Sequence, residues 1–431
     1  MAFIAYFSEN PYFDPNAEWF REGAGSVYDL ELSNKVYDPT LGSDLWAQAL
    51  DEKVFAEAVG FDGIMLNEHH SSPFTMRSGV MNLEAAILAR ITERVKIVLL
   101  GNILPIWDDP LRLLEELSAV DVISKGRLVS GFVRGTGRES YAHNSQPPYN
   151  WERFQEAHDF MIKAWTTPGP FRWEGNHYHY RYVNPFWRTF QQPHPPIWIP
   201  GLVSRSTVEW AAAHRYPYIV FSSRTDLVNQ VFELYREEGS KHGYQAGSEH
   251  VGCVARVVVA ETEAKSHELG HKFIEGPGNP FLEGSRGRVN VWAQNLPGLN
   301  PRAVTAQLPT AQAAFFRESR GLGQTAPLLT PEEMRAGIDP ATRRDERSRR
   351  DAVYQGLLDA KSMIVGTPDQ AIVGLRELLE TVRPGILIIW GGDGAMTHDE
   401  HMTSIQLLGE RVLPAVREIA EGLDIRSCFE S

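Results

Sequence analysis

Cysteine is scarce in this chain: Cys253 and Cys428 are the only two among 431 residues. Two cysteines so far apart cannot build the disulfide framework of a small secreted protein, which predicts a reducing, cytoplasmic location. No apolar run approaches the roughly 18 residues of a membrane-spanning helix. The first eight residues lack the basic start and apolar length of a secretory signal, so we expect them to form a core strand.

Positive charge is also in short supply. The chain has 42 Lys and Arg against 55 Asp and Glu, a net charge of −13, and no basic stripe of the kind that binds nucleic acids. The one basic cluster, residues 343–350, alternates with acidic residues and is typical of a solvated helix face. Adjacent histidines at 69 and 70 are poorly spaced for zinc, so no metal site is predicted. The sequence shows no repeat of fixed period.

What the sequence does contain is a regular alternation of apolar strand-like runs and helical patterns. Near-continuous apolar strands separated by helices indicate a parallel sheet that is covered on both sides. About eight such strands predict a closed (β/α)8 TIM barrel, with the whole chain, 1–431, as a single domain. The predicted strands are 2–8, 61–67, 95–100, 127–132, 196–200, 216–221, 251–260 and 386–390. The predicted helices are 43–59, 81–91, 110–123, 151–165, 204–213, 226–242 and 398–422.

Two segments depart from this alternation. Residues 166–192 are rich in Trp, Tyr, His and Pro and predict a hairpin-like excursion. Residues 261–350 form a long insertion between the seventh and eighth strands, which in a compact domain is typical of a lid, a partner surface or a disordered segment. Aromatic residues of this insertion fit either a substrate wall or simple packing onto the barrel: Phe281, Trp292, Phe315 and Phe316.

Polar residue types follow several predicted strands directly, where barrel enzymes place their chemistry. Glu68-His69-His70 is one such place, and because neighbouring residues of an extended chain point opposite ways, at most one histidine faces a given ligand. An imidazole suits general acid or base catalysis. The alternative is a histidine that only bonds a carbonyl at the strand end. Gly101-Asn102 ends another strand, where the glycine either admits a flat ring or makes a turn.

Two further strand ends suggest an anion site. Arg134 lies between Gly131 and Gly135, where an arginine is suited to clamp a phosphate, although it also fits a surface loop. The Gly-x-Gly here does not indicate a dinucleotide fold, because no helix is expected to follow directly. Ser204 and Thr207 begin a predicted helix, whose start either binds an anion or is simply capped by Ser204. In a closed barrel both features face the same mouth.

Taken in order, these segments resemble the bacterial luciferase-like flavin-dependent monooxygenase family. The resemblance spans about residues 1–260 and 360–422, and rests on the order of many short motifs. They are Gly60-Phe61-Asp62, Glu68-His69-His70, Leu104-Pro105, Asp109-Pro110-Leu111-Arg112, Glu115-Glu116, residues 121–127 and 131–135, Pro195-Pro196-Ile197-Trp198, Ser204 to Thr207 with Glu209-Trp210-Ala211-Ala212, Val365-Gly366-Thr367-Pro368 and residues 410–414.

The resemblance implies a flavin at the carboxyl-terminal mouth of the barrel, and it implies residue roles. Arg134, Ser204 and Thr207 match the residues at the flavin phosphate. His69 matches the active-site histidine near the reacting edge of the flavin. Leu100, Gly101 and Asn102 match the strand end that lies along the isoalloxazine ring in this family. That strand end often contains a non-prolyl cis peptide. The reactive cysteine of luciferase is Val133 here, so light emission is not expected.

The implied activity is oxygenation of a small, apolar organic substrate by reduced FMN and O2 through a flavin peroxy adduct. Because no nicotinamide-binding domain is evident, we expect NAD(P)H to act through a partner flavin reductase. The resemblance also implies a homodimer formed by helices near the start of the barrel. Two alternatives stay open: a coenzyme F420-dependent oxidoreductase that transfers hydride on the same fold, and a flavin-binding protein without turnover.

Overall fold

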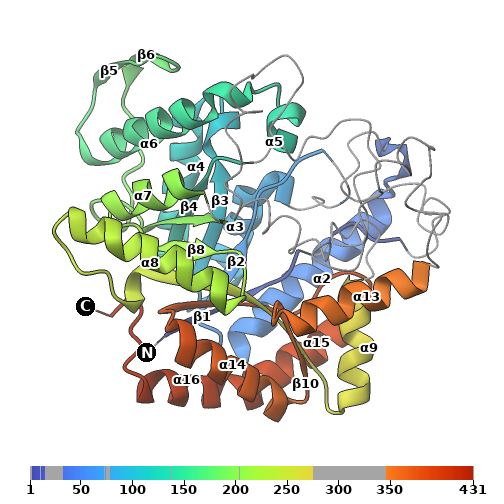
Figure 1. Cartoon of the computed structure of the whole chain (residues 1–431). Coiled ribbons are helices and arrows are strands. Elements are labelled where there is room, and N and C mark those ends of the chain that lie inside the picture. The colour runs from blue at the N-terminus through green and yellow to red at the C-terminus, as the bar shows by residue number, and fades with distance from the viewer. Residues whose placement is uncertain are drawn as a thin grey trace, which may run out of the picture.

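The chain folds as a closed barrel of eight parallel strands (Figure 1). The computed structural model describes residues 2–9, 11–14, 33–71, 73, 78–135, 137–202, 204–274 and 346–430. The pairing of β8 with β9 closes the barrel, and a ninth parallel strand, β10 (Met363–Gly366), pairs with the end of β9. The predicted TIM barrel is therefore confirmed. Its strands are β1 (Phe3–Phe7), β2 (Gly63–Leu66), β3 (Lys96–Ile103), β4 (Leu128–Val133), β7 (Ile197–Gly201), β8 (Tyr218–Val220), β9 (Val251–Val259) and β11 (Ile386–Trp390).

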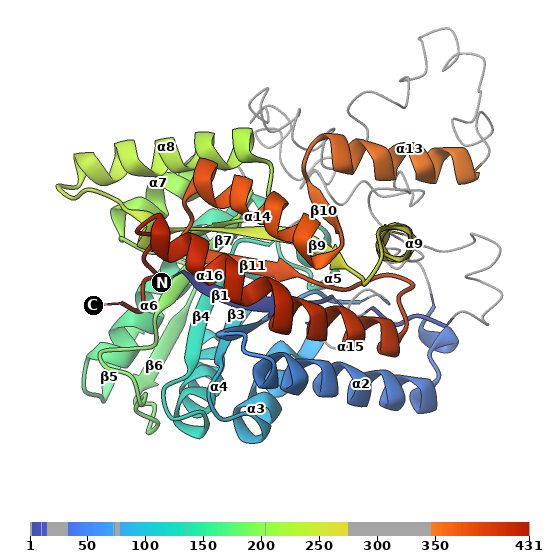
Figure 2. The same cartoon turned by 90° about the horizontal axis from the view of Figure 1, so that it is seen from below.

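Helices surround the barrel on the outside (Figure 2). The long ones are α2 (Pro39–Ala58), α4 (Pro110–Ile123), α6 (Asn150–Thr166), α8 (Thr225–Lys241), α13 (Glu346–Asp359) and α14 (Pro368–Val382). The shorter ones are α3 (Met81–Ile91), α5 (Gly137–Ala142), α7 (Arg205–Ala213), α9 (Glu263–Ile274), α15 (His398–Leu407) and α16 (Leu413–Gly422). The predicted excursion is an antiparallel hairpin, β5 (Phe171–Glu174) and β6 (His179–Val183), which projects from the barrel beside α6.

Strand side chains alternate between two cores, as the period of two requires. Val98 and Leu100 of β3 point into the barrel, whereas Leu99 packs outward against the helices. Large aromatic side chains fill the barrel interior, among them Phe7 and Trp198. A filled interior leaves only the rim at the carboxyl ends of the strands for chemistry.

Three sequence-based predictions of helices were wrong in detail. The helix predicted from residue 43 starts at Pro39, because Asp38 caps it by accepting from the Thr40 amide at 2.8 Å. The helix predicted for 398–422 contains a π-helical turn at residues 408–412, just before Pro414. A short helix, α5, does follow the glycine-rich loop after Arg134, contrary to the expectation of none.

The insertion between the seventh and eighth strands contains α9 at its start and α13 at its end. These two helices pack together, with His267 Nδ1 2.7 Å from the Tyr354 hydroxyl. The four aromatic residues proposed for a substrate wall, at positions 281, 292, 315 and 316, lie outside the described residues. No helix among the described segments combines the length and the apolar character needed to cross a membrane.

Candidate active site

The parallel strands deliver the sequence-predicted residues to one rim of the barrel. His69 follows β2, Arg134 follows β4 and Ser204 follows β7. Gly101 and Asn102 lie near the carboxyl end of β3. All strands of a parallel barrel end on the same side, so residues from positions 69 to 204 share one mouth. The structure thus brings together side chains that are distant in sequence.

Arg134, Ser204 and Thr207 form one polar cluster. Arg134 Nη2 donates to Ser204 Oγ at 2.8 Å, and Thr207 Oγ1 donates to the same oxygen at 3.1 Å. Ser204 is the N-cap of α7, yet its side chain makes no capping hydrogen bond to the helix. Its hydroxyl faces Arg134 instead, so the simple capping alternative does not describe this serine. A guanidinium and two hydroxyls at a helix start are suited to a phosphate.

The Arg134 guanidinium is held away from carboxylates. It lies over the Trp151 ring, with Cζ 5.1 Å from the ring centroid. Burial lowers the pKa of Arg134, and the nearby Tyr218 opposes this shift. Within the described part of the chain, no carboxylate forms an ion pair with Arg134. Because a half-buried cation gains from an anionic partner, this site fits an anionic ligand.

His69 and His70 take different partners, as their opposite directions required. His69 Nδ1 lies 2.9 Å from Glu139 Oε1, and Glu139 is buried in α5. His70 Nε2 lies 3.3 Å from Glu68, whose other oxygen accepts from the Ile103 amide at 2.6 Å. His69 is the more exposed of the two histidine side chains. It is therefore the histidine better placed to meet a ligand, with Nδ1 fixed by Glu139.

The end of β3 is shaped by a cis peptide and by close packing of Gly101 on β4. The Leu100–Gly101 peptide is cis, as the family resemblance implied. A Cβ on Gly101 would lie 2.6 Å from the Gly131 backbone, so close packing of β3 on β4 requires this glycine. Asn102 is buried and donates to Asn82 Oδ1 at 3.1 Å on α3, pointing outward. Flavin contacts at this strand end stay a prediction, and for Asn102 they concern its backbone.

An aromatic wall that the sequence did not indicate stands at the ends of β1, β8 and β11. Phe7 and Trp390 have ring centroids 5.1 Å apart, and Phe221 lies 6.1 Å from Phe7. Arg256 of β9 lies over Trp390, with Cζ 4.6 Å from the ring centroid. The three aromatic residues, Phe7, Phe221 and Trp390, were overlooked because each stands at the end of an ordinary apolar strand. No group of three or more His, Cys, Asp or Glu side chains in the described segments is arranged to hold a metal ion.

Comparisons with known proteins agree with this geometry. The family model described as luciferase-like monooxygenase matches residues 32–383. The alkanal monooxygenase alpha chain of Photorhabdus luminescens is 27% identical over 222 residues, which cover 51% of this chain and 60% of that protein. The oxygenase component of the flavin-dependent trigonelline monooxygenase of Acinetobacter baylyi is 28% identical, over 38% of this chain and 46% of its own length. The chain thus matches less than two thirds of either relative.

Solved structures share the fold over almost the whole chain. The oxygenating constituent of 3,6-diketocamphane monooxygenase from Pseudomonas putida, in complex with FMN, superimposes with a TM-score of 0.65 at 19% identity. That match covers 96% of this chain and 99% of the other. The coenzyme F420-dependent tetrahydromethanopterin reductase of Methanopyrus kandleri gives a TM-score of 0.59 at 15% identity, covering 96% and 98%. Together with the family match over most of its length, the order of its motifs places this chain in the luciferase-like monooxygenase family.

Proposed function

We propose that this protein is a flavin-dependent monooxygenase that uses reduced FMN and O2 to oxygenate a small, apolar organic substrate. The observation that carries the proposal is the cluster of Arg134, Ser204 and Thr207, in which a half-buried guanidinium and the Thr207 hydroxyl both donate to the Ser204 hydroxyl. Its chemistry fits the FMN phosphate, and its place at the rim fits a cofactor at the barrel mouth. When bound, reduced FMN would supply the electrons that activate O2.

The chain's own residues have distinct tasks in this proposal. Arg134, Ser204 and Thr207 bind and orient the cofactor through its phosphate. His69 holds or moves a proton at Nε2, because Glu139 occupies its Nδ1. The aromatic wall around Phe7 and Trp390 offers an apolar face that keeps water from the mouth. The strand end from Leu100 to Asn102 is proposed to lie along the flavin ring.

Two relatives support a separate source of reduced flavin. One is described as an oxygenase component and the other as an oxygenating constituent, terms that belong to enzymes with more than one protein. We therefore propose that NAD(P)H reduces the flavin on a partner reductase. We also propose a homodimer, because apolar side chains are exposed beside one another near the start of the barrel. They are Val80, Leu83, Ile91 and Ile123.

The test is phosphate-dependent flavin binding. The wild-type protein should bind reduced FMN more tightly than reduced riboflavin, measured by anaerobic fluorescence titration. Arg134→Ala should weaken FMN binding by about 10- to 100-fold, as expected for loss of a charged hydrogen bond, and leave riboflavin binding unchanged. Arg205→Ala is the matched control. Arg205 begins α7, the helix that carries Thr207, but its guanidinium pairs with Glu209 at 2.7 Å.

Cofactor identity is decided in the same experiment. The fold is shared with an F420-dependent reductase, so coenzyme F420 is titrated alongside FMN. Preference for F420, with substrate-dependent F420 reduction, contradicts the oxygenase proposal and favours hydride transfer. Flavin binding with no loss of any activity in His69→Ala favours a binding protein without turnover. If no flavin binds, the assignment of the rim is wrong.

A further inference from the structure

A second group of buried ionisable side chains lies away from the Arg134 cluster and from His69. Glu52 of α2 is buried, and each of its carboxylate oxygens meets a histidine of α15. Oε1 is 3.1 Å from His398 Nδ1, and Oε2 is 3.1 Å from His401 Nδ1. His401 is buried, whereas 25% of the His398 side chain is exposed. Two histidines and one carboxylate therefore connect the surface with the interior.

A cavity of about 70 Å³ adjoins this group. Glu52, Asp393, His398 and His401 line it. This volume has room for a few water molecules. The lining also includes the apolar side chains of Phe13, Leu45 and Met396, so the four ionisable groups are the partners for such water. The loop after β11 comes close to His401, since a Cβ on Gly392 would lie 3.1 Å from His401 Nε2. Water in this cavity can thus bridge His401 and Asp393, which belongs to the same loop.

The inner end of the group reaches the barrel mouth. Asp393 follows β11, and besides burial the negative charge of Glu9, which follows β1, contributes to raising the pKa of Asp393. Asn67 Nδ2 donates to Glu9 Oε2 at 2.5 Å. Asn67 stands at the end of β2, two residues before His69. The series from His398 to Glu9 therefore ends on the rim that carries the proposed catalytic histidine.

Packing alone gives no reason for this arrangement. Buried ionisable groups cost stability unless they are paired, and apolar side chains would join α2 to α15 without that cost. Burial and Glu9 raise the pKa of Asp393 to about 7, while the Gly394 amide, His401 and Arg256 of β9 oppose the shift. Burial lowers the pKa of His401, but Glu52, Asp393 and Glu400 outweigh it and raise that pKa overall. Asp393 therefore exchanges its proton near neutral pH, and His401 keeps its proton to a higher pH than an ordinary histidine does.

We propose that His398, Glu52, His401 and Asp393 form a proton relay from solvent to the barrel mouth. The inference rests on the proposed function, which consumes protons in a site closed to water. With substrate S, FMNH⁻ + O2 + S + H⁺ gives FMN + SO + H2O. Without substrate, FMNH⁻ + O2 + H⁺ gives FMN + H2O2. One proton per turnover must therefore enter the mouth.

The contacts define the order of transfer. A proton taken up at His398 Nε2 releases the Nδ1 proton of that ring to Glu52 Oε1. The Glu52 carboxyl group then rotates, so that its protonated oxygen faces His401, and it becomes a carboxylate again by protonating His401 Nδ1. His401 then gives its Nε2 proton through cavity water to Asp393, which passes it to the mouth beside Glu9. One proton enters and one leaves, so each group keeps its starting number of protons. The two imidazole rings regain their starting tautomers by proton exchange with water before the next transfer.

The experiment follows reoxidation of enzyme-bound reduced FMN by O2 in a stopped-flow instrument, without organic substrate, in H2O and D2O across neutral to alkaline pH. We expect His401→Gln and Asp393→Asn to slow reoxidation about tenfold or more at alkaline pH, in the range of general acid catalysis. Added imidazole should restore part of the rate in the histidine variants. His398→Gln should slow reoxidation less. Because the His398 side chain is partly exposed, this variant replaces His401→Gln in the test if His401→Gln does not fold.

The control is His242→Gln, which alters an exposed His–Glu pair on α8, with Glu238 at 3.3 Å. Equal slowing in this control overturns the relay. Normal flavin binding with unchanged rate and unchanged solvent isotope effect in His398→Gln and Asp393→Asn overturns the relay and leaves the proposed function standing. Failure of the wild-type protein to bind reduced FMN overturns the proposed function and the relay with it.

Discussion

A single carboxylate decides how His69 is presented. Glu139 is buried and lies 2.9 Å from His69 Nδ1, so it holds the imidazole ring in one orientation. We expect Glu139→Gln to lower kcat for oxygenation about tenfold or more, because an amide does not hold one tautomer of the imidazole. The KM for reduced FMN should stay within about twofold, since the phosphate cluster is untouched. Steady-state kinetics with a supplied flavin reductase measure both.

The matched control is Glu152→Gln. Glu152 also meets a histidine, with His177 Nε2 at 3.3 Å, but its side chain is 65% exposed on α6. This variant should keep wild-type kcat. If Glu139→Gln raises KM and leaves kcat unchanged, Glu139 shapes cofactor binding and does not position His69.

The sequence alone predicted the candidate site residues at strand ends, but not the residues that hold them in place. Arg134, Ser204 and Thr207 were predictable because a parallel barrel gathers strand ends at one rim. Glu139 was missed because no helix was expected after the glycine-rich loop, and nothing in the sequence links it to His69. Gly101 was recognised as special, but its actual reason, contact with the β4 backbone, depends on strand packing that one sequence does not show.

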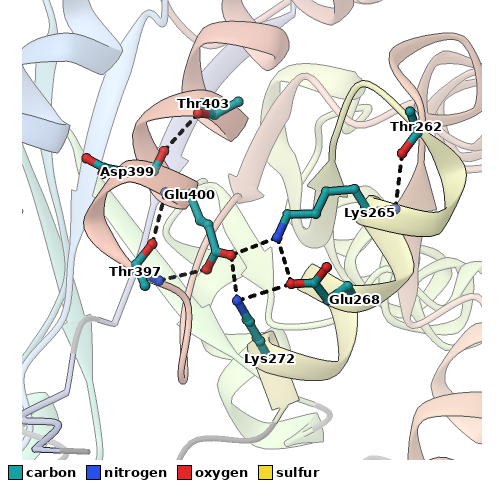
Figure 3. A network of polar contacts seen from close by, with 8 residues as sticks. All are labelled: Thr262, Lys265, Glu268, Lys272, Thr397, Asp399, Glu400 and Thr403. Carbon is teal, nitrogen blue, oxygen red and sulfur yellow. Dashed lines mark hydrogen bonds and ion pairs between the residues drawn. The ribbon is translucent and has the colours of Figure 1, made fainter.

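At the scale of elements, one ion-pair network joins α9 to α15 (Figure 3). Glu400 Oε1 accepts from Lys272 at 2.5 Å and from Lys265 at 3.0 Å, both on α9. Its other oxygen accepts from the Thr397 amide and completes the capping box of α15. The network therefore fixes α9, the helix that leads into the insertion, to the helix after the last barrel strand.

Glu400→Gln tests this junction through its pH dependence. Burial opposes ionisation of Glu400, but hydrogen bonds from Lys272, the Thr397 amide and Lys265 outweigh it and hold the pKa at about 2. A folded pKa below the unfolded value adds stability above about pH 4.5, which is lost as the pH falls toward about 2. Glutamine preserves the capping box and removes the charge. We expect a loss of about 1–2 kcal/mol at pH 7 in urea unfolding, discounted for the partly exposed lysines.

The loss should shrink steadily between about pH 5 and pH 2, because the wild-type carboxylate loses its advantage there. Glu268→Gln makes the same chemical change in the same network, but its side chain is 51% exposed, so it should cost clearly less stability than Glu400→Gln. An equal loss in both variants at every pH would mean that the network stabilises through packing alone.

Helices were predicted best where the sequence marks their first turn clearly. The helix from Pro110 to Ile123 matched because Asp109 and Pro110 mark its start unmistakably. The extra strand β10 and helices α9 and α14 were missed, because residues 261–385 were not divided into strands and helices beyond the predicted insertion. The start of α13 does fall in residues 343–350, which were predicted to be a solvated helix face. Helix α15 was predicted as longer because a π-helical turn keeps its periodicity while changing its hydrogen bonds.

At the scale of the whole molecule, exposed apolar side chains gather on neighbouring elements. The Leu83 side chain of α3 is 58% exposed and Ile91 is 44% exposed, while Ile123 of α4, which packs on α3, is 46% exposed. Val80, just before α3, is 47% exposed. Isolated apolar residues on a surface are ordinary, but a group on adjacent helices favours burial against a partner.

We expect the wild-type protein to sediment as a dimer of its 48.5 kDa chain, and Leu83→Asp to sediment as a monomer at the same concentration. The reason is that a new carboxylate at the centre of an apolar interface loses its hydration and gains no partner. Val373→Asp is the matched control, because Val373 of α14 is 67% exposed and stands apart from this group. It should leave the dimer intact. A monomeric wild-type protein contradicts the homodimer, whereas a dimer that survives Leu83→Asp means that the chain associates through another face, with α3 left open to a different partner such as the reductase.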